Sequence, residues 1–172
     1  MTDLARIEIA AECHDCDDIP KVESAGTVLE EPEGSVQLMH NGLRIFVDSH
    51  YGSYNTEIIR RLHGHHEPQE ERAFFEVLRT IRHGGTIMEL GSFWAYYSLW
   101  FLTVVPESKA ILVEPLESSL HAGQKNFELN QRKGVFVRAA IDEVAAPESK
   151  VELWPGMFRP SAGSPTACTR QR

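Results

Sequence analysis

The stretch TIMELGSFWAYYS at residues 86–98 constrains the fold more than any other part of the chain. It begins with a short apolar run that carries a single charge, Glu89, a pattern typical of a buried parallel strand. Gly91 then permits a sharp turn, and Ser92 is placed to cap the helix that follows. A strand that turns through glycine into a helix directs free backbone N–H groups at one point, where polar ligand atoms can bind. The stretch therefore predicts a small-molecule site.

A second signal is Glu114, which follows the apolar run AILV. In doubly wound α/β folds, an acidic residue at the end of the second strand faces the ligand crevice, and its two oxygens can accept both hydroxyls of a ribose. The G-x-G-x-x-G pattern of a pyrophosphate site is missing, because Phe93 and further bulky residues follow Gly91. The pattern favours a nucleoside without phosphates, such as S-adenosylmethionine, whose ammonium group Glu89 can meet.

The segments ELGSFWAYYS, VEP, NFELN and RAAI follow one another between residues 41 and 142. In order and spacing they resemble the motifs of the FkbM family of S-adenosylmethionine-dependent methyltransferases. The chain departs from the family at Phe93, where asparagine is common, and at Ala95, where glycine is common. The resemblance implies a Rossmann-like α/β methyltransferase fold, S-adenosylmethionine as cofactor, and O-methylation of a hydroxylated metabolite or sugar.

The resemblance also adds residues to the expected cofactor site. A glutamate just before a helix lies close to the cofactor in similar methyltransferases, and Glu67 is the matching position, although a charge role at the helix N-terminus explains it equally well. The backbone after the third strand brackets adenine in this fold. No catalytic residue is assigned, and the expected cofactor contacts are Glu67, Glu89, Gly91, Ser92, Phe93, Glu114, Ala140 and Asp142.

The elements expected before the glycine turn are a β-hairpin and two helices. Alternating apolar residues flank Asn41-Gly42, which favours a two-residue type I′ turn within a hairpin at residues 35–47. A short helix is expected at 55–62. A second helix opens at Pro68, and its expected apolar face, which should pack on the sheet, consists of Phe74, Val77, Leu78 and Ile81.

After the turn we expect helices at 92–104 and 116–130 and a buried strand at 135–141. Residues 1–34 have weak periodicity and predict an extended arm with one short strand near 27–29, and residues 156–172 predict a loose tail. The cofactor-binding domain is therefore expected at 35–155. Its three core strands account for only the first half of a doubly wound sheet, so we expect an incomplete fold. The alternative function is a non-catalytic binding or assembly module that self-associates through an unpaired sheet edge.

Two short motifs contain residues that can bind metal ions. Cys13 and Cys16 form a C-x-x-C, which is either half of a zinc site or a redox pair, or simply two reduced thiols; no second pair follows at the usual spacing. His63, His65 and His66 form the run HGHH, in which a metal site and plain polar loop residues are both possible readings. Since neither motif has four ligands, we expect no bound metal.

The net charge of −8 argues against nucleic acid or an anionic membrane surface as a partner, since both attract clustered cations. No apolar run approaches the roughly 20 residues that would span a bilayer. Three cysteines do not form a disulfide framework. The sequence thus predicts a cytoplasmic protein that acts on a small molecule.

Overall fold

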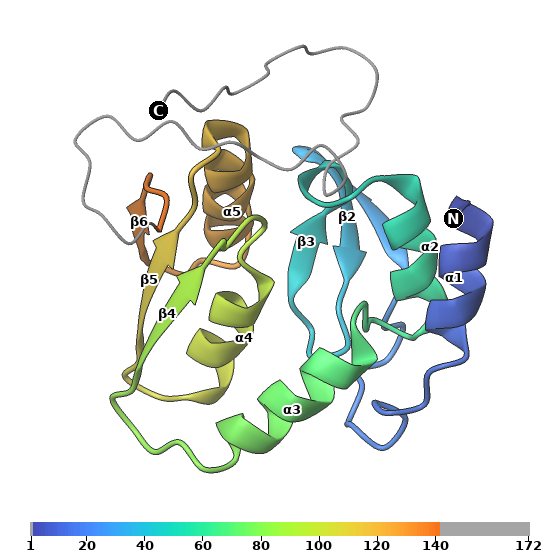
Figure 1. Cartoon of the computed structure of the whole chain (residues 1–172), viewed down its shortest axis with the longest axis horizontal. Helices are drawn as coiled ribbons and strands as arrows, with labels where there is room; N and C mark the ends of the chain where they lie inside the picture. Colours follow the sequence, from blue (N-terminus) through green and yellow to red (C-terminus); the bar gives the residue numbers. More distant parts are fainter. Residues whose placement is uncertain (1, 142–172) are drawn as a thin grey trace.

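Two three-stranded sheets organise residues 2–141, the part of the chain that the computed structural model describes (Figure 1). One sheet is antiparallel, in the order β1 (Val28–Glu31), β2 (Gly34–Leu38) and β3 (Arg44–Phe46). The other is parallel, in the order β4 (Thr86–Leu90), β5 (Lys109–Val113) and β6 (Val135–Val137). The described residues thus have a mixed α/β fold with a parallel three-stranded sheet, as the sequence predicts at this coarse level.

The hairpin formed by β2 and β3 confirms one sequence prediction but corrects its turn. Val36 lies opposite Phe46, so the predicted strands do pair. The N–H of Met39 donates to the carbonyl of Leu43 at 2.8 Å, and the N–H of Gly42 donates to the carbonyl of Met39 at 3.0 Å. The loop therefore has three residues and not two, and Gly42, with φ +85°, takes the left-handed position that this longer loop requires.

The start of the chain is helical, so the extended arm predicted there is wrong for its first part. Helix α1 (Asp3–Ala11) is capped by the hydroxyl of Thr2, which accepts from the N–H of Ala5 at 3.3 Å. It packs beside α2 (Ser53–Arg61). Only Ile7 of α1 is fully buried, which explains why its apolar periodicity is weak in the sequence.

Helix α3 (Pro68–Leu78) begins at the predicted proline but does not use the whole predicted face. Leu78 is buried, whereas Val77 is 51% exposed. The ring of Phe74 contacts Tyr97 and Trp100, with centroids 5.0 and 5.3 Å apart. These aromatic contacts join α3 to the helix that follows β4, where packing on the sheet itself was expected.

The two crossover helices are α4 (Tyr96–Val104) and α5 (Glu117–Leu129). Both lie on the same side of the parallel sheet, where Ala110 and Leu112 of β5 are buried (Figure 1). Helix α4 begins at Tyr96, four residues after Ser92, so the predicted start is wrong. Strand β6 is shorter than the predicted run at 135–141, and residues 142–172, including the predicted tail, lie outside the described part.

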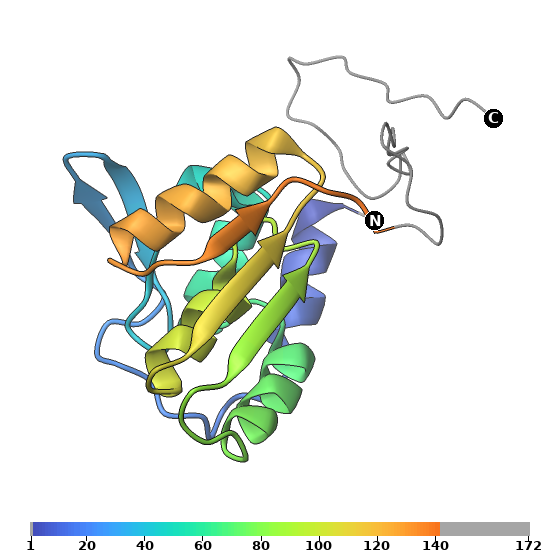
Figure 2. The same ribbon diagram turned by 90° about the vertical axis from the view of Figure 1, so that its left-hand side faces the viewer.

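The opposite side of the parallel sheet carries no helix among the described residues (Figure 2). Met88 and Leu90 of β4 are 57% and 55% exposed, and Val135 of β6 is 60% exposed. Met88 lies opposite Ile111 of β5, which in turn lies opposite Val135, so a row of apolar side chains crosses the open face. The stretch 86–90 was predicted to be buried, but Thr86, Met88 and Leu90 are exposed and only Ile87 and Glu89 are partly buried.

No helix within residues 2–141 has the length and apolar character needed to cross a membrane.

Candidate functional site

The glycine turn after β4 adopts the sharp bend that the sequence predicts. Gly91 has φ +75°, and a Cβ added there would meet no atom of the described residues within 4 Å, so this corner borders open space. The N–H groups of Gly91 and Ser92 both donate to the carbonyl of Val113, at 2.8 and 3.1 Å. The turn is therefore attached to the end of β5, at the carboxyl edge of the parallel sheet.

The next residues of the turn also have left-handed backbones. Phe93 has φ +42° and Ala95 has φ +63°, conformations that favour glycine or asparagine. Helix α5 packs closely on Phe93 and Ala95 at Gly123. A Cβ on Gly123 would lie 2.8 Å from the carbonyl oxygen of Phe93 and 3.1 Å from the Cβ of Ala95. Gly123 was not identified from the sequence, where it reads only as an isolated glycine within a helix.

Glu114 lies next to this turn, as expected, and is only 6% exposed. Its Oε2 accepts from the N–H of Phe93 at 3.1 Å, and its Oε1 accepts from the N–H of Leu116 at 2.9 Å. Each carboxylate oxygen has a second acceptor position, so Glu114 can hold the turn and still accept two hydroxyls. The glutamate and the glycine turn, predicted separately, are thus brought together.

The expectation of free N–H groups is wrong for the first residues of the turn. Those of Gly91, Ser92 and Phe93 are all donated inside the protein, as described above, and the N–H of Ala95 donates to the carbonyl of Ser92 at 2.6 Å. These four backbone donors are therefore engaged in holding the turn itself. A ligand here would be bound by side chains and by the remaining acceptor positions of Glu114.

Ser92 does not cap the helix as predicted, whereas the predicted contact of Glu89 with a cofactor stays a prediction. The Ser92 hydroxyl is buried and has no hydrogen-bond partner within residues 2–141, so it does not cap α4. Oε2 of Glu89 accepts from the N–H of Ser98 in the first turn of α4 at 3.1 Å, and thereby supplies the cap that Ala95 at the N-cap position cannot. Burial raises the pKa of Glu89 from its ordinary value of 4.5 to about 7.

Glu67 lies at the start of α3 and is partly exposed. Its Oε2 is 3.1 Å from Nε2 of His66 and accepts from the hydroxyl of Tyr97 at 3.4 Å. The hydrogen bond from His66 is the main reason that the pKa of Glu67 is lowered. Glu67 is therefore tied to α4 through Tyr97, and it carries a negative charge at neutral pH.

Tyr51 lies against the turn and was not identified from the sequence. Its ring packs edge to face on Phe93, with centroids 5.0 Å apart. Burial is the main cause that raises the pKa of Tyr51, and the negative charges of Glu67 and Glu114 raise it further. The only sequence signal was an aromatic residue directly before Gly52.

Of the two residues expected to contact adenine, only one lies in the part of the chain that the structure describes. Ala140 lies in the segment after β6 and is half-buried. Asp142 lies outside the described residues. The role of both in adenine binding stays a prediction.

Asn126 of α5 and Asn130, the residue directly after this helix, hold neighbouring segments together through their side-chain amides. Oδ1 of Asn126 accepts from the N–H of Phe46, and its Nδ2 donates to the carbonyl of Trp94 at 2.9 Å. Oδ1 of Asn130 accepts from the N–H of Arg44 at 3.0 Å, and its Nδ2 donates to the Arg44 carbonyl at 2.6 Å. The amides therefore join the edge of β3 to α5 and to the turn beside Glu114.

Comparison with models of known protein families finds no match for this chain. No curated protein and no solved structure matches it either. The geometry of the turn and of the residues around it is therefore what supports a function.

Proposed function

We propose that the chain binds S-adenosylmethionine at the turn after β4, and that it serves as the cofactor domain of an FkbM-like methyltransferase acting on a hydroxylated metabolite or sugar. The observation that carries the proposal is the position of Glu114 beside Gly91. Both lie at the carboxyl ends of neighbouring parallel strands, the edge where α/β folds bind nucleosides.

The state of the turn supports a nucleoside without phosphates. A pyrophosphate is bound by several free backbone N–H groups, and those of Gly91, Ser92 and Phe93 are already engaged. A ribose needs acceptors instead, which the remaining lone pairs of Glu114 supply. The aromatic side chains of Phe93 and Tyr51 add apolar surface next to the same carboxylate.

In a methyl transfer of this kind, an acceptor oxygen attacks the sulfonium methyl group in line with the departing sulfur. The protein contributes by positioning the two reactants and by removing the hydroxyl proton. We assign no general base among the described residues.

Calorimetric titration with S-adenosylhomocysteine tests the proposal. Glu114→Ala removes a charged acceptor, which should weaken binding about tenfold or more. Glu117→Ala is the matched control, because Glu117 is exposed and pairs only with Arg138 among its described contacts. Binding of equal strength to the wild type and Glu114→Ala would contradict the proposal.

Glu114→Ala also removes the acceptor for two backbone N–H groups, so a second measurement must separate ribose binding from folding. A ribose-deoxygenated analogue of S-adenosylhomocysteine should bind the wild type more weakly than the parent compound. In Glu114→Ala, the two ligands should bind equally. An unchanged penalty for the analogue in the variant would show that Glu114 does not contact the ribose.

A second candidate function, assembly with another copy of this chain, is favoured by the open face of the parallel sheet. That face is crossed by apolar rows with exposed Met88, Leu90 and Val135, and large exposed apolar patches mark association surfaces. Light scattering should find a dimer at micromolar concentration and a monomer for Met88→Lys. A monomeric wild type would remove this candidate.

A further inference from the structure

Three buried side chains of metal-binding type meet near the N-terminal part of α3. They are Cys16, from the segment after α1, His65, from the connection between α2 and α3, and Glu71, from the first turns of α3. One ligand atom of each lies within 4.8 Å of the other two, and all three residues are buried. The site proposed above uses none of them.

The ligand atoms of this cluster are held in place by their neighbours. Nδ1 of His65 pairs with Oε2 of Glu71, while Oε1 of Glu71 accepts from the N–H of His66 at 2.9 Å. The His65 side chain is only 1% exposed, and its Nε2 has no hydrogen-bond partner among the described residues. A buried nitrogen without a partner costs free energy, and coordination of an ion would remove that cost.

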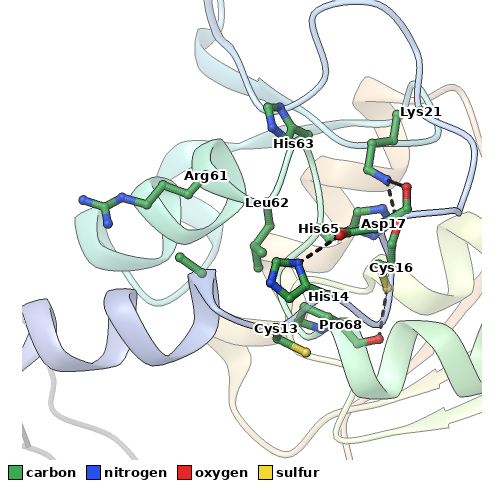
Figure 3. A pocket seen from close by; sticks show the side chains of 11 residues that line it. Cys13, His14, Cys16, Asp17, Lys21, Arg61, Leu62, His63, His65 and Pro68 are labelled. Carbon is green, nitrogen blue, oxygen red and sulfur yellow. Dashed lines mark hydrogen bonds and ion pairs between the residues drawn. The ribbon is translucent and has the colours of Figure 1, made fainter.

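The thiol of Cys16 completes the set. Its Sγ donates a weak hydrogen bond to the carbonyl of Pro68 at 3.0 Å, so the sulfur lies at the first residue of α3 (Figure 3). The ammonium of Lys21 donates to the carbonyls of Cys16 and Asp17 at 2.7 and 3.0 Å, which fixes the turn that carries the cysteine. The sulfur, nitrogen and oxygen donors thus come from backbone segments that are themselves well anchored.

A pocket of about 210 Å³ borders the cluster at Cys16 and His65. Cys13, His14, Cys16 and His65 are among the residues that line it (Figure 3). The pocket gives an ion a way in, and it leaves room for a water molecule as an additional ligand. Zinc sites with three protein ligands have this arrangement, with the fourth position open.

We propose that Cys16, His65 and Glu71 bind a zinc ion whose fourth position faces this pocket. Magnesium and calcium prefer ligand sets made of oxygen alone, whereas zinc accepts sulfur, nitrogen and oxygen together. The ligand atoms of bound zinc lie about 3.5 Å apart, so the three side chains adjust to this spacing when the ion enters. The thiol proton of Cys16 is released to solvent as the zinc–sulfur bond forms.

This proposal replaces the expectation of no metal, and the reason is topological. The C-x-x-C motif and the run HGHH each contain too few ligands when they are considered separately. The fold places one residue of each motif beside Glu71, which belongs to neither motif. The ion then fastens the segment after α1 to the start of α3.

The test uses the full chain, purified without chelator and then stripped and reloaded. Mass spectrometry of the metal content should find one zinc per chain. Titration of the stripped chain with Co²⁺ should produce the near-ultraviolet charge-transfer band of a cobalt–thiolate bond. In Cys16→Ser, whose hydroxyl can still donate to Pro68, this band should vanish and zinc affinity should fall at least tenfold, with an unchanged circular dichroism spectrum.

His65→Gln and Glu71→Gln should also lose zinc. Their matched controls, His63→Gln and Glu70→Gln, change exposed residues of the same segments and should keep one zinc per chain. A folded wild type that takes up neither zinc nor cobalt stoichiometrically would overturn the proposal. Equal zinc affinity in Cys16→Ser and the wild type would overturn it as well. Neither result bears on binding of S-adenosylhomocysteine, so the two proposals fail independently.

Discussion

The glycine turn after β4 and the buried cluster of Cys16, His65 and Glu71 are built in opposite ways. The turn comes from consecutive residues, and Glu114 joins it from the end of the neighbouring strand. The cluster takes single residues from three separate segments. The comparison teaches that a site made of consecutive residues can be predicted from a single sequence. A site assembled by packing cannot, even when two of its residues belong to recognisable motifs.

The largest effect is expected for Glu71→Ala, which should break the cluster and spare the turn. The variant leaves the imidazoles of His65 and His66 and the N–H of His66 without their buried acceptor. Removing one partner of a buried ionic network costs about 4 kcal/mol. Urea unfolding in the presence of a chelator measures the loss, with Glu70→Ala as control. A loss similar to that of the control would mean that the cluster contributes little to stability.

The second prediction concerns the pH dependence of stability that Glu89, next to the glycine turn, should cause. Its raised pKa, about 7 against 4.5, means that the folded protein keeps a proton that the unfolded chain releases between these values. Stability from this group is therefore complete below pH 4.5 and is lost as the pH rises to 7. The loss amounts to about 3 kcal/mol.

Glu89→Gln removes this dependence, because its amide oxygen can still accept from Ser98 and carries no charge. Urea unfolding of the wild type and the variant across pH 4 to 8 gives the difference directly. The variant should gain relative stability as the pH rises, while zinc uptake stays the same. Parallel stability profiles would show that Glu89 titrates normally.

Gly123→Ala should strain the turn and leave the cluster intact. The new Cβ would lie 2.8 Å from the carbonyl oxygen of Phe93, which cannot move without shifting the backbone next to Glu114. Overpacking of this kind should cost about 2 kcal/mol, despite the better helix propensity of alanine. Thermal unfolding measures the cost, and Ser118→Ala, at an exposed position of α5, is the control. Loss of zinc uptake would show that the two regions are coupled.

The smallest effect is expected for Ala95→Gly. Glycine relieves the left-handed backbone at φ +63°, worth about 1 kcal/mol, but loses the buried methyl group, worth about 0.8 kcal/mol. The stability should therefore change by less than about 0.5 kcal/mol. Added to Gly123→Ala, it should recover part of the lost stability, because it removes one of the two close contacts. Strict additivity of the two variants would contradict this contact.

The sequence predicted the helices and strands better than the contacts between them. Strands β4 and β5 and helices α3 and α5 were found because glycine, proline and periodic apolar residues mark them locally. Helix α1 was missed because it buries little, and the turn of the hairpin was misassigned because Asn41-Gly42 suits both loop lengths. For the site, the proximity of Glu114 and Gly91 was predictable from topology. The contacts of Tyr51, Gly123 and Asn126 were not, since each depends on a segment distant in the chain.

The open face of the parallel sheet has a calorimetric consequence. Unfolding raises the heat capacity mainly through apolar surface that becomes newly hydrated, about 12 to 15 cal/mol/K per residue in ordinary domains. Met88, Leu90 and Val135 are already more than half hydrated in the folded chain, so they add little to this change. As a monomer, the protein should therefore have a heat-capacity increment below that of other chains of its length. Its stability should consequently vary less steeply with temperature.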